Sequence, residues 1–299
     1  MNVHDLLSLP PWDWPVEAHE MILEALRDAQ APKDHRRVAV ELAGELVVME
    51  DRLAEELLGI LTDPQEPAEL RAGAAIALGP ALEEADMEGP EPDPEYLSVS
   101  PALMRRATLV LREIHDDPEA PKLVRRRALE GAVRWPEPWQ IRAVREAFRS
   151  ADREWKITAV FCMQFLTGFK EEVREVLDTD DPVLLKETIL AAGTQEVEEA
   201  WPLLEDVVSR AVHGPPRFPD LPDHEREILF AAIETAPLIR PEETQELLDE
   251  LVELDDPDVH SAVEENLEIA GFLLEEWEED EEEEEEDLDG GVDDGRVWH

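Results

Sequence analysis

Few residue patterns in this sequence could support catalysis, and metal binding is the first to consider. His-Glu dipeptides occur at His19-Glu20 and at His224-Glu225, and imidazole with carboxylate is a ligand combination that divalent metals accept. Two such dipeptides mean little in a chain with 76 acidic residues. The run His115-Asp116-Asp117 offers the same atoms, but it lies where an Asp is already expected to cap a helix. We therefore predict no metal site, no catalytic residue and no cofactor site.

Nucleophilic chemistry is not indicated either. Cys162 is the only cysteine and lies in the apolar stretch AVFCMQFL, whereas a reactive thiol needs partial exposure and a nearby base. We predict a buried packing residue. The sequence also contains no Gly-rich phosphate loop and no CxxC pair.

One part of the sequence reverses the sign of the charge. The chain carries a net charge of −49, yet between Pro101 and Lys156 there are 13 Lys and Arg against 9 Asp and Glu. The candidate binding residues in this part are Arg105, Arg106, Arg112, Arg142, Arg145 and Arg149. Arginine grips carboxylates with a planar fork, so these side chains are a candidate site for an acidic segment of a partner or of this chain. The alternative is structural pairing with carboxylates on adjacent helices.

A repeated triplet indicates where the helices that position these residues begin. Asp-Asp-Pro occurs at 116–118, at 180–182 and at 255–257. Asp is a favoured N-cap and Pro is tolerated at the first helical position, so each copy is predicted to open a helix. Further starts are predicted near Asp34, Thr62, Asp152 and Asp223.

Each start is followed by apolar residues at helical spacing, a break at Gly or Pro, and a second apolar stripe. Val124, Ala128 and Ala132 share one face in the third unit, and Ile141, Val144 and Phe148 follow after the prolines on a face opposite the arginines. A single helical hairpin cannot bury its apolar face, whereas stacked hairpins share one core. The predicted fold is therefore an all-α superhelix, an α-solenoid of about seven helical hairpins.

Three stretches resemble the first helices of HEAT repeats of the short bacterial type named after the phycobilisome lyases. They are LRAGAAIALG at 70–79, LVRRRALEGA at 123–132 and DPDVHSAVEENLEIAG at 256–271. The resemblance implies that second helices line the concave side, which would place the arginines there. Proteins of this kind serve as scaffolds, inhibitors, lyases or nucleic-acid binders, and those that are metal-dependent hydroxylases use several facing His-Glu pairs. The resemblance thus implies a fold, and function has to be argued from a site.

The predicted organisation has three parts. Residues 1–33 form an N-terminal cap and helix, in which Trp12 and Trp14 pack over the end of the first hairpin. Residues 34–274 form the solenoid, with Pro-rich surface insertions near 79–101 and 211–223. Residues 275–299 form an acidic tail, expected to be disordered from about Asp280 because a run of carboxylates repels itself and offers little to bury.

The charge also limits the partners. An acidic surface repels phosphates and anionic lipids, so neither nucleic acid nor membrane is expected as a partner. No stretch of the sequence is apolar enough for a membrane span, and one cysteine permits no internal disulfide, which favours the cytoplasm. We predict a non-catalytic scaffold or adaptor for a protein partner, with an intramolecular contact of the acidic tail as a further candidate. The alternative is a metal-dependent enzyme or lyase-type protein that uses the His-Glu pairs.

Overall fold

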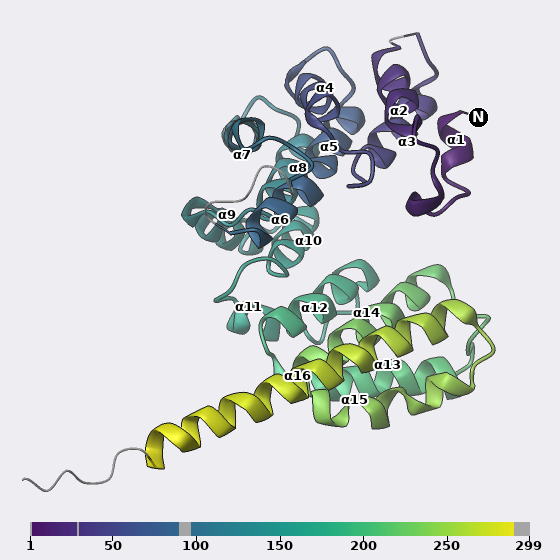
Figure 1. Cartoon of the computed structure of the whole chain (residues 1–299), viewed down its shortest axis with the longest axis vertical. Helices are drawn as coiled ribbons and strands as arrows, with labels where there is room; N and C mark the ends of the chain where they lie inside the picture. Colours follow the sequence, from purple (N-terminus) through teal and green to yellow (C-terminus); the bar gives the residue numbers. More distant parts are fainter. Residues whose placement is uncertain (1, 29, 90–96, 290–299) are drawn as a thin grey trace, which may run out of the picture. The chain divides into compact units, whose positions relative to one another are not determined.

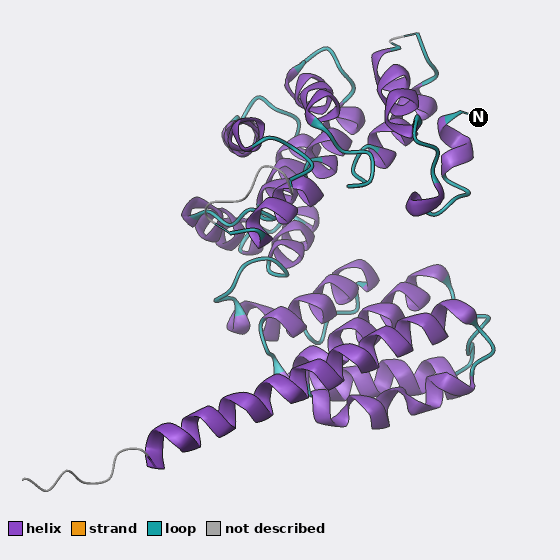
Figure 2. Ribbon diagram, in the orientation of Figure 1, coloured by secondary structure: helices purple, strands orange, loops and turns teal. Residues whose placement is uncertain are grey.

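The computed structural model describes residues 2–28, 30–89 and 97–289, with side chains in the last helix described to Glu275. Every regular element in this part of the chain is a helix (Figure 2), which confirms the predicted all-α fold class. The chain divides into two compact units, Met1–Leu166 and Thr167–His299. The predicted boundaries at 34 and 274 stay predictions.

The first unit contains helical hairpins that follow one another along the chain (Figure 1). Its elements are α1 (Val3–Leu6), η1 (Pro11–Asp13), α2 (Ala18–Arg27), α3 (Lys33–Leu42), α4 (Asp51–Thr62), α5 (Ala68–Ala77), α6 (Gly79–Met87), α7 (Pro101–Asp116), α8 (Lys122–Ala132), α9 (Pro138–Phe148) and α10 (Arg153–Cys162). Helices α3, α5, α8 and α10 contact one another in sequence order, and α2, α4 and α7 do the same. The first set lies on the inner side of the arc in Figure 1, and α2, α4, α7 and α9 lie on the outer side.

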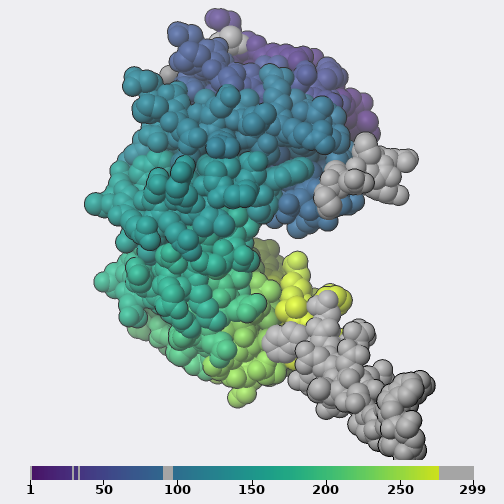
Figure 3. Space-filling view, turned by 90° about the vertical axis from the view of Figure 1, so that its left-hand side faces the viewer, coloured from purple at the N-terminus to yellow at the C-terminus, as the bar shows by residue number. Residues whose placement is uncertain are grey.

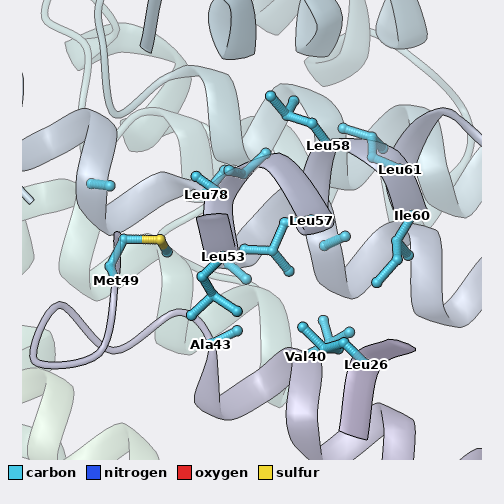
Figure 4. Close-up of a cluster of buried hydrophobic side chains, with 14 of the residues drawn as sticks. Leu26, Val40, Ala43, Met49, Leu53, Leu57, Leu58, Ile60, Leu61 and Leu78 are labelled. Carbon is cyan, nitrogen blue, oxygen red and sulfur yellow. The ribbon is translucent and has the colours of Figure 1, made fainter. Parts of the chain in front are cut away.

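The core of this unit lies between the two sets of helices. Leu53, Leu57 and Leu61 of α4 are at most 1% exposed and belong to the buried cluster of Figure 4, together with Val40 of α3 and Leu78 at the end of α5. The three leucines of α4 recur at intervals of four residues, which places them on one face of the helix. Burying such side chains supplies the main drive for stacking the hairpins.

Three connections between hairpins share one turn structure. The turns begin at Asp28, Asp63 and Asp117, whose carboxylates accept the amides of Gln30, Gln65 and Glu119 at 2.9, 2.8 and 2.9 Å. A proline follows four residues later as the N-cap of the next helix, at Pro32, Pro67 and Pro121. An arginine follows after four more residues, and its Nε donates to the carbonyl that ends the preceding helix: Arg36 to Leu26, Arg71 to Leu61 and Arg125 to His115, at 2.9–3.0 Å.

This turn corrects the predicted role of Asp-Pro at two sites. Asp117 is the C-cap residue of α7, and α8 begins only after Pro121, so Asp117 organises the turn and is not the N-cap of a helix. Asp63 does the same after α4. The prediction is confirmed at Asp181, whose carboxylate accepts the amides of Val183 and Leu184. Asp256 likewise accepts the amides of the first turn of α16.

The N-terminal tryptophans have different environments. The Trp14 indole donates to the carbonyls of Leu6 and Leu9 at 3.2 and 3.0 Å, so it fixes the chain after α1. Trp12 is 80% exposed. The prediction that both pack over the first hairpin is therefore wrong for Trp12.

The insertion predicted as a surface loop near 79–101 begins with a packed helix. Ala81, Leu82 and Ala85 of α6 are buried, and α6 contacts α8. Glu84 of this helix accepts hydrogen bonds from the amide and hydroxyl of Ser98, at 2.8 and 2.9 Å. Tyr96, expected in the same loop, lies outside the described residues.

The second unit is a smaller stack of the same kind. Its elements are α11 (Lys170–Arg174), α12 (Pro182–Thr194), η2 (Glu198–Ala200), α13 (Trp201–His213), α14 (Asp223–Ile239), α15 (Pro241–Leu248), η3 (Asp249–Glu253) and α16 (Pro257–Asp289). Helices α12, α14 and α16 pack in a row, with α13 and α15 against them. Over both units, helices begin within one residue of five of the seven predicted starts, and near Thr62 and Asp117 the next helix begins five or six residues later, after the turn.

The last helix continues into the acidic tail. The backbone of α16 remains helical to Asp289, beyond the point near Asp280 where disorder is predicted; residues 290–299 lie outside the described part. In the described residues, no helix has the length and apolar character needed to cross a membrane.

Candidate functional site

The exposed face of α7 carries three of the six predicted arginines. Leu103, Met104, Ala107 and Leu111 of this helix are buried, so positions one or two residues away face outward. The exposed residues on that outer face include Arg105, Arg106, Leu109, Arg112, Glu113 and Asp116. Leu109 is 60% exposed. The face is therefore basic with an apolar centre.

Of the other three predicted arginines, Arg142 and Arg145 lie on α9 and Arg149 is its C-cap residue. Val144 and Phe148 are buried, as predicted, and Arg142 and Arg149 are exposed on the other side of the helix. Arg145 is half-buried and has interactions of its own. Ile141 is 39% exposed, so the prediction that it belongs to the buried stripe is wrong.

Side chains join the two helices at Trp139. The Arg112 guanidinium of α7 lies over the Trp139 ring, 5.6 Å from its centroid, and the His115 ring lies 5.5 Å from the same ring. Trp139 is one turn before Arg142 on α9. We call the combined surface of the six arginines on α7 and α9 the arginine face, and Figure 3 views the molecule from this side.

The arginine face does not line the concave side of the first unit. Helices α7 and α9 lie on the outer side of the arc in Figure 1, whereas a groove on the other side is lined by α3, α5 and α8. The prediction that second helices line the concave side is therefore wrong. The groove has an apolar floor that includes Val40 and Ile76, with a rim of mixed charge.

The ion pairs of Arg112 and Arg142 on the arginine face are weak and local. Arg112 lies 3.8 Å from Asp116, and Arg142 lies 3.8 Å from Glu146, each pair one turn apart on its own helix. The Arg142 side chain is 78% exposed, and exposed pairs of this kind contribute little to stability. Among the described residues, Arg105, Arg106 and Arg149 have no carboxylate within 4.0 Å. The predicted alternative of pairing with adjacent helices therefore does not account for these five arginines.

A small pocket borders this face, and the sequence analysis did not predict it. His115, Arg125, Ser150 and Trp155 line it together with Ala143, Glu146 and Ala147 of α9. The His115 Nδ1 lies 3.4 Å from the Arg125 carbonyl oxygen, and burial lowers the pKa of His115. His115 thus has a packing role, in agreement with the prediction for His115-Asp116-Asp117. The sequence analysis did not identify Arg125 or Trp155 as site residues. The spacing Asp-x3-Pro-x3-Arg, which recurs in three turns, could have identified Arg125.

The two His-Glu pairs do not form metal sites in the described part of the chain. Both oxygens of Glu20 accept hydrogen bonds from Arg52, at 2.6 and 3.2 Å, and these lower the pKa of Glu20. His224 and Glu225 lie on the surface, 3.9 Å apart. No group of three or more His, Cys, Asp or Glu side chains among the described residues could hold a metal ion. The donor sets present therefore do not fit the metal centre of the alternative, and we derive no reaction step from it.

Cys162 is fully buried in α10. This exposure fits the predicted packing role, because a buried thiol in apolar surroundings is a poor nucleophile.

Comparisons with known proteins give distant structural likenesses. No protein-family model matches the sequence, and no curated protein sequence matches it. The structure of human deoxyhypusine hydroxylase in complex with glycerol is similar with a TM-score of 0.38 and 16% identity, over 90% of this chain and 88% of that chain. The X-ray structure of Escherichia coli YibA is similar with a TM-score of 0.34 and 11% identity, over 89% of this chain and 95% of that chain.

The first comparison corrects the predicted function. The chain was expected to be a non-catalytic scaffold and not an enzyme, but the similar structure is that of a hydroxylase, which fits the enzyme alternative better. Absence of catalysis therefore cannot be inferred from the repeat fold, and we do not retain either prediction. At this TM-score and identity the likeness assigns no activity to this chain.

Proposed function

We propose that the first unit binds an acidic polypeptide segment on the arginine face. The observation that carries the proposal is a set of five exposed arginines, in a chain whose net charge is −49: Arg112 and Arg142 have only weak pairs on their own helices, and Arg105, Arg106 and Arg149 have no described carboxylate within 4.0 Å. The proposal concerns recognition, and it applies equally to a segment held as a partner and to a segment presented as a substrate.

The chemistry of the face favours carboxylates on a peptide. Guanidinium groups form paired hydrogen bonds with carboxylates, and Leu109, 60% exposed among the arginines of α7, offers apolar contact to a neighbouring side chain. A long polyphosphate backbone would also meet the acidic surface around the face, which opposes nucleic acid. An acidic peptide can be short enough to avoid that surface.

The test is the binding of a fluorescein-labelled hexaglutamate peptide to the full chain, followed by fluorescence anisotropy at low salt. Arg142→Glu combined with Arg149→Glu should weaken binding by at least about tenfold, because two attractive charges become repulsive. The matched control is Arg210→Glu in the second unit, where Arg210 is 55% exposed and pairs with Asp206 of its own helix. Equal affinity of the double variant and the wild type would overturn the proposal. A single-stranded oligonucleotide that binds better than the peptide would also overturn it.

Two finer assignments accompany this proposal. We propose that the repeats are of the short HEAT-like type, supported by the three turns with the spacing Asp-x3-Pro-x3-Arg. We also propose a cytoplasmic location, supported by the single cysteine, which permits no internal disulfide.

A further inference from the structure

The three equivalent turns of the first unit each contain an arginine at the same position, but the guanidinium groups of these arginines have different partners. In each turn the arginine Nε donates to the carbonyl at the end of the preceding helix. In the first turn the two remaining nitrogens of Arg36 also hold a carboxylate: Nη1 and Nη2 donate to the two oxygens of Glu66, both at 2.8 Å. Glu66 belongs to the next turn along the chain, so it closes a bidentate pair across two repeats.

The third turn has the arginine without the carboxylate. Arg125 donates through Nε to His115, but no described carboxylate lies within 4.0 Å of its guanidinium. The next connection, between α9 and α10, is shorter and contains no counterpart of Glu66. Trp155 of α10 packs there instead, with the Arg125 guanidinium 5.7 Å from its ring centroid.

Access distinguishes the third turn from the second. Arg71 also has no carboxylate partner among the described residues, but it is only 6% exposed. Arg125 is half-buried and lines a pocket of about 200 Å³. Among the three turn arginines, Arg125 is thus the one that is half-buried beside a pocket and has no described carboxylate on its guanidinium.

We propose that this pocket receives the carboxylate of one Asp or Glu side chain of the bound acidic segment, with Arg125 as its anchor in the manner that Arg36 holds Glu66. The inference rests on the proposed function and names the position at which the segment is fixed. Arg125 is already oriented by its Nε bond to His115 and by Trp155, so little rotamer freedom is lost on binding. The Ser150 hydroxyl, which accepts the Asp152 amide at 3.1 Å, also lines the pocket and can donate its own hydrogen.

One charge in the pocket opposes the proposal and provides a test of it. Glu146 lines the same pocket, and its side chain is 71% exposed and lies 3.8 Å from Arg142. A carboxylate that enters must tolerate this neighbour, so removal of its charge should strengthen binding. Glu113 on α7 is exposed beside the same arginines but does not line this pocket, so it is the matched control.

The main experiment compares Arg125→Lys with Arg36→Lys in the hexaglutamate titration of the full chain. Lysine keeps the charge but cannot form the fork, so Arg125→Lys should weaken binding about tenfold. Arg36→Lys alters the equivalent turn, whose carboxylate site is already filled by Glu66, and should leave binding unchanged. Glu146→Gln should tighten binding more than Glu113→Gln does.

A measurement on the unmodified sequence covers the case in which Arg125→Lys does not fold. In protein labelled with 5-fluorotryptophan, the peptide should shift the ¹⁹F resonance of Trp155, assigned with Trp155→Phe, and leave that of Trp14 in place. Peptide binding without an effect of Arg125→Lys, or with an unshifted Trp155 signal, would overturn the anchor and leave the arginine face standing. Absence of peptide binding at low salt would overturn both proposals.

Discussion

Gly131 of α8 lies directly against the backbone of Ala75 in α5: a Cβ atom at position 131 would come within 2.2 Å of the Ala75 carbonyl oxygen. Small residues therefore allow two neighbouring first helices to approach closely. Helices α7 and α9 carry the larger residues Met104, Leu111, Trp139 and Phe148 instead, and their backbones approach each other at fewer positions than those of α5 and α8. Because α5 and α8 pack more closely than α7 and α9 do, the stack of hairpins bends toward the side of α5 and α8.

Gly131→Ala should destabilise the protein by about 2–3 kcal/mol, because the clash is with backbone and a whole helix must move. The control is Gly59→Ala in α4, where an added Cβ meets no atom within 4 Å. That substitution should stabilise the protein by about 0.5–1 kcal/mol through helix propensity and unfolded-state entropy. Chemical denaturation of both variants measures the two effects, and equal changes would contradict the close approach of α5 and α8.

A second prediction concerns the buried polar contact between α8 and α10. The Arg126 Nε donates to the Thr158 hydroxyl at 2.8 Å, and that hydroxyl donates to the Glu130 carboxylate. Thr158 is 0% and Glu130 1% exposed. Thr158→Val keeps the shape but removes the shared hydroxyl, which should cost about 2 kcal/mol. Thr108→Val removes only a bond to the Arg105 carbonyl of its own helix and should change the free energy of unfolding by less than about 0.5 kcal/mol; a similar loss in both variants would speak against the network.

Acid sensitivity should depend on Lys122. Hydrogen bonds from its ammonium group lower the pKa of Asp152 and the pKa of Glu154 below their ordinary values of 3.8 and 4.5. Carboxylates with a lowered pKa in the folded state contribute stability above their unfolded pKa and lose it as the pH falls through the folded value. Lys122→Gln should therefore remove part of the stability seen above pH 5 and flatten its decline below pH 4.5. Melting temperatures of both proteins between pH 3 and pH 7 check this, and parallel curves would show that the contacts do not matter.

Metal analysis addresses the enzyme alternative. The described residues contain no group of three metal-ligating side chains, so the purified full chain should contain iron and zinc well below one equivalent, and EDTA should leave its melting temperature unchanged. Stoichiometric metal whose removal lowers the melting temperature would contradict this expectation and support a metal centre that includes residues outside the described part.

The helical starts could be predicted from sequence because capping chemistry is local. Asp152, Asp181 and Asp256 cap α10, α12 and α16 through their own side chains. Asp63 and Asp117 are followed by Pro, as Asp181 and Asp256 are, but they act in turns because Pro67 and Pro121 four residues later set the helix start. The presence of a second Pro four residues after the Asp therefore distinguishes a turn from an N-cap, and the Asp-Pro pair alone does not.

Two features of the site depend on packing and could not be predicted from local sequence. Residue type and spacing identified the arginines of α7 and α9, but the side of the arc on which they lie depends on how closely neighbouring helices pack. The accessible fork of Arg125 depends on the absence of a carboxylate from another repeat. Such an absence becomes visible only when the turns are compared in three dimensions.

The most direct test of the arginine face is the salt dependence of hexaglutamate binding to the full chain, measured for the wild type and for Arg142→Glu with Arg149→Glu. If several guanidinium groups hold the peptide, wild-type affinity should fall at least about tenfold between about 20 mM and about 200 mM NaCl, because salt screens exposed charges. The double variant should bind much more weakly at the lower salt and show a shallower dependence. Wild-type binding that is insensitive to salt, or no binding at about 20 mM NaCl, would contradict recognition of an acidic segment by this face.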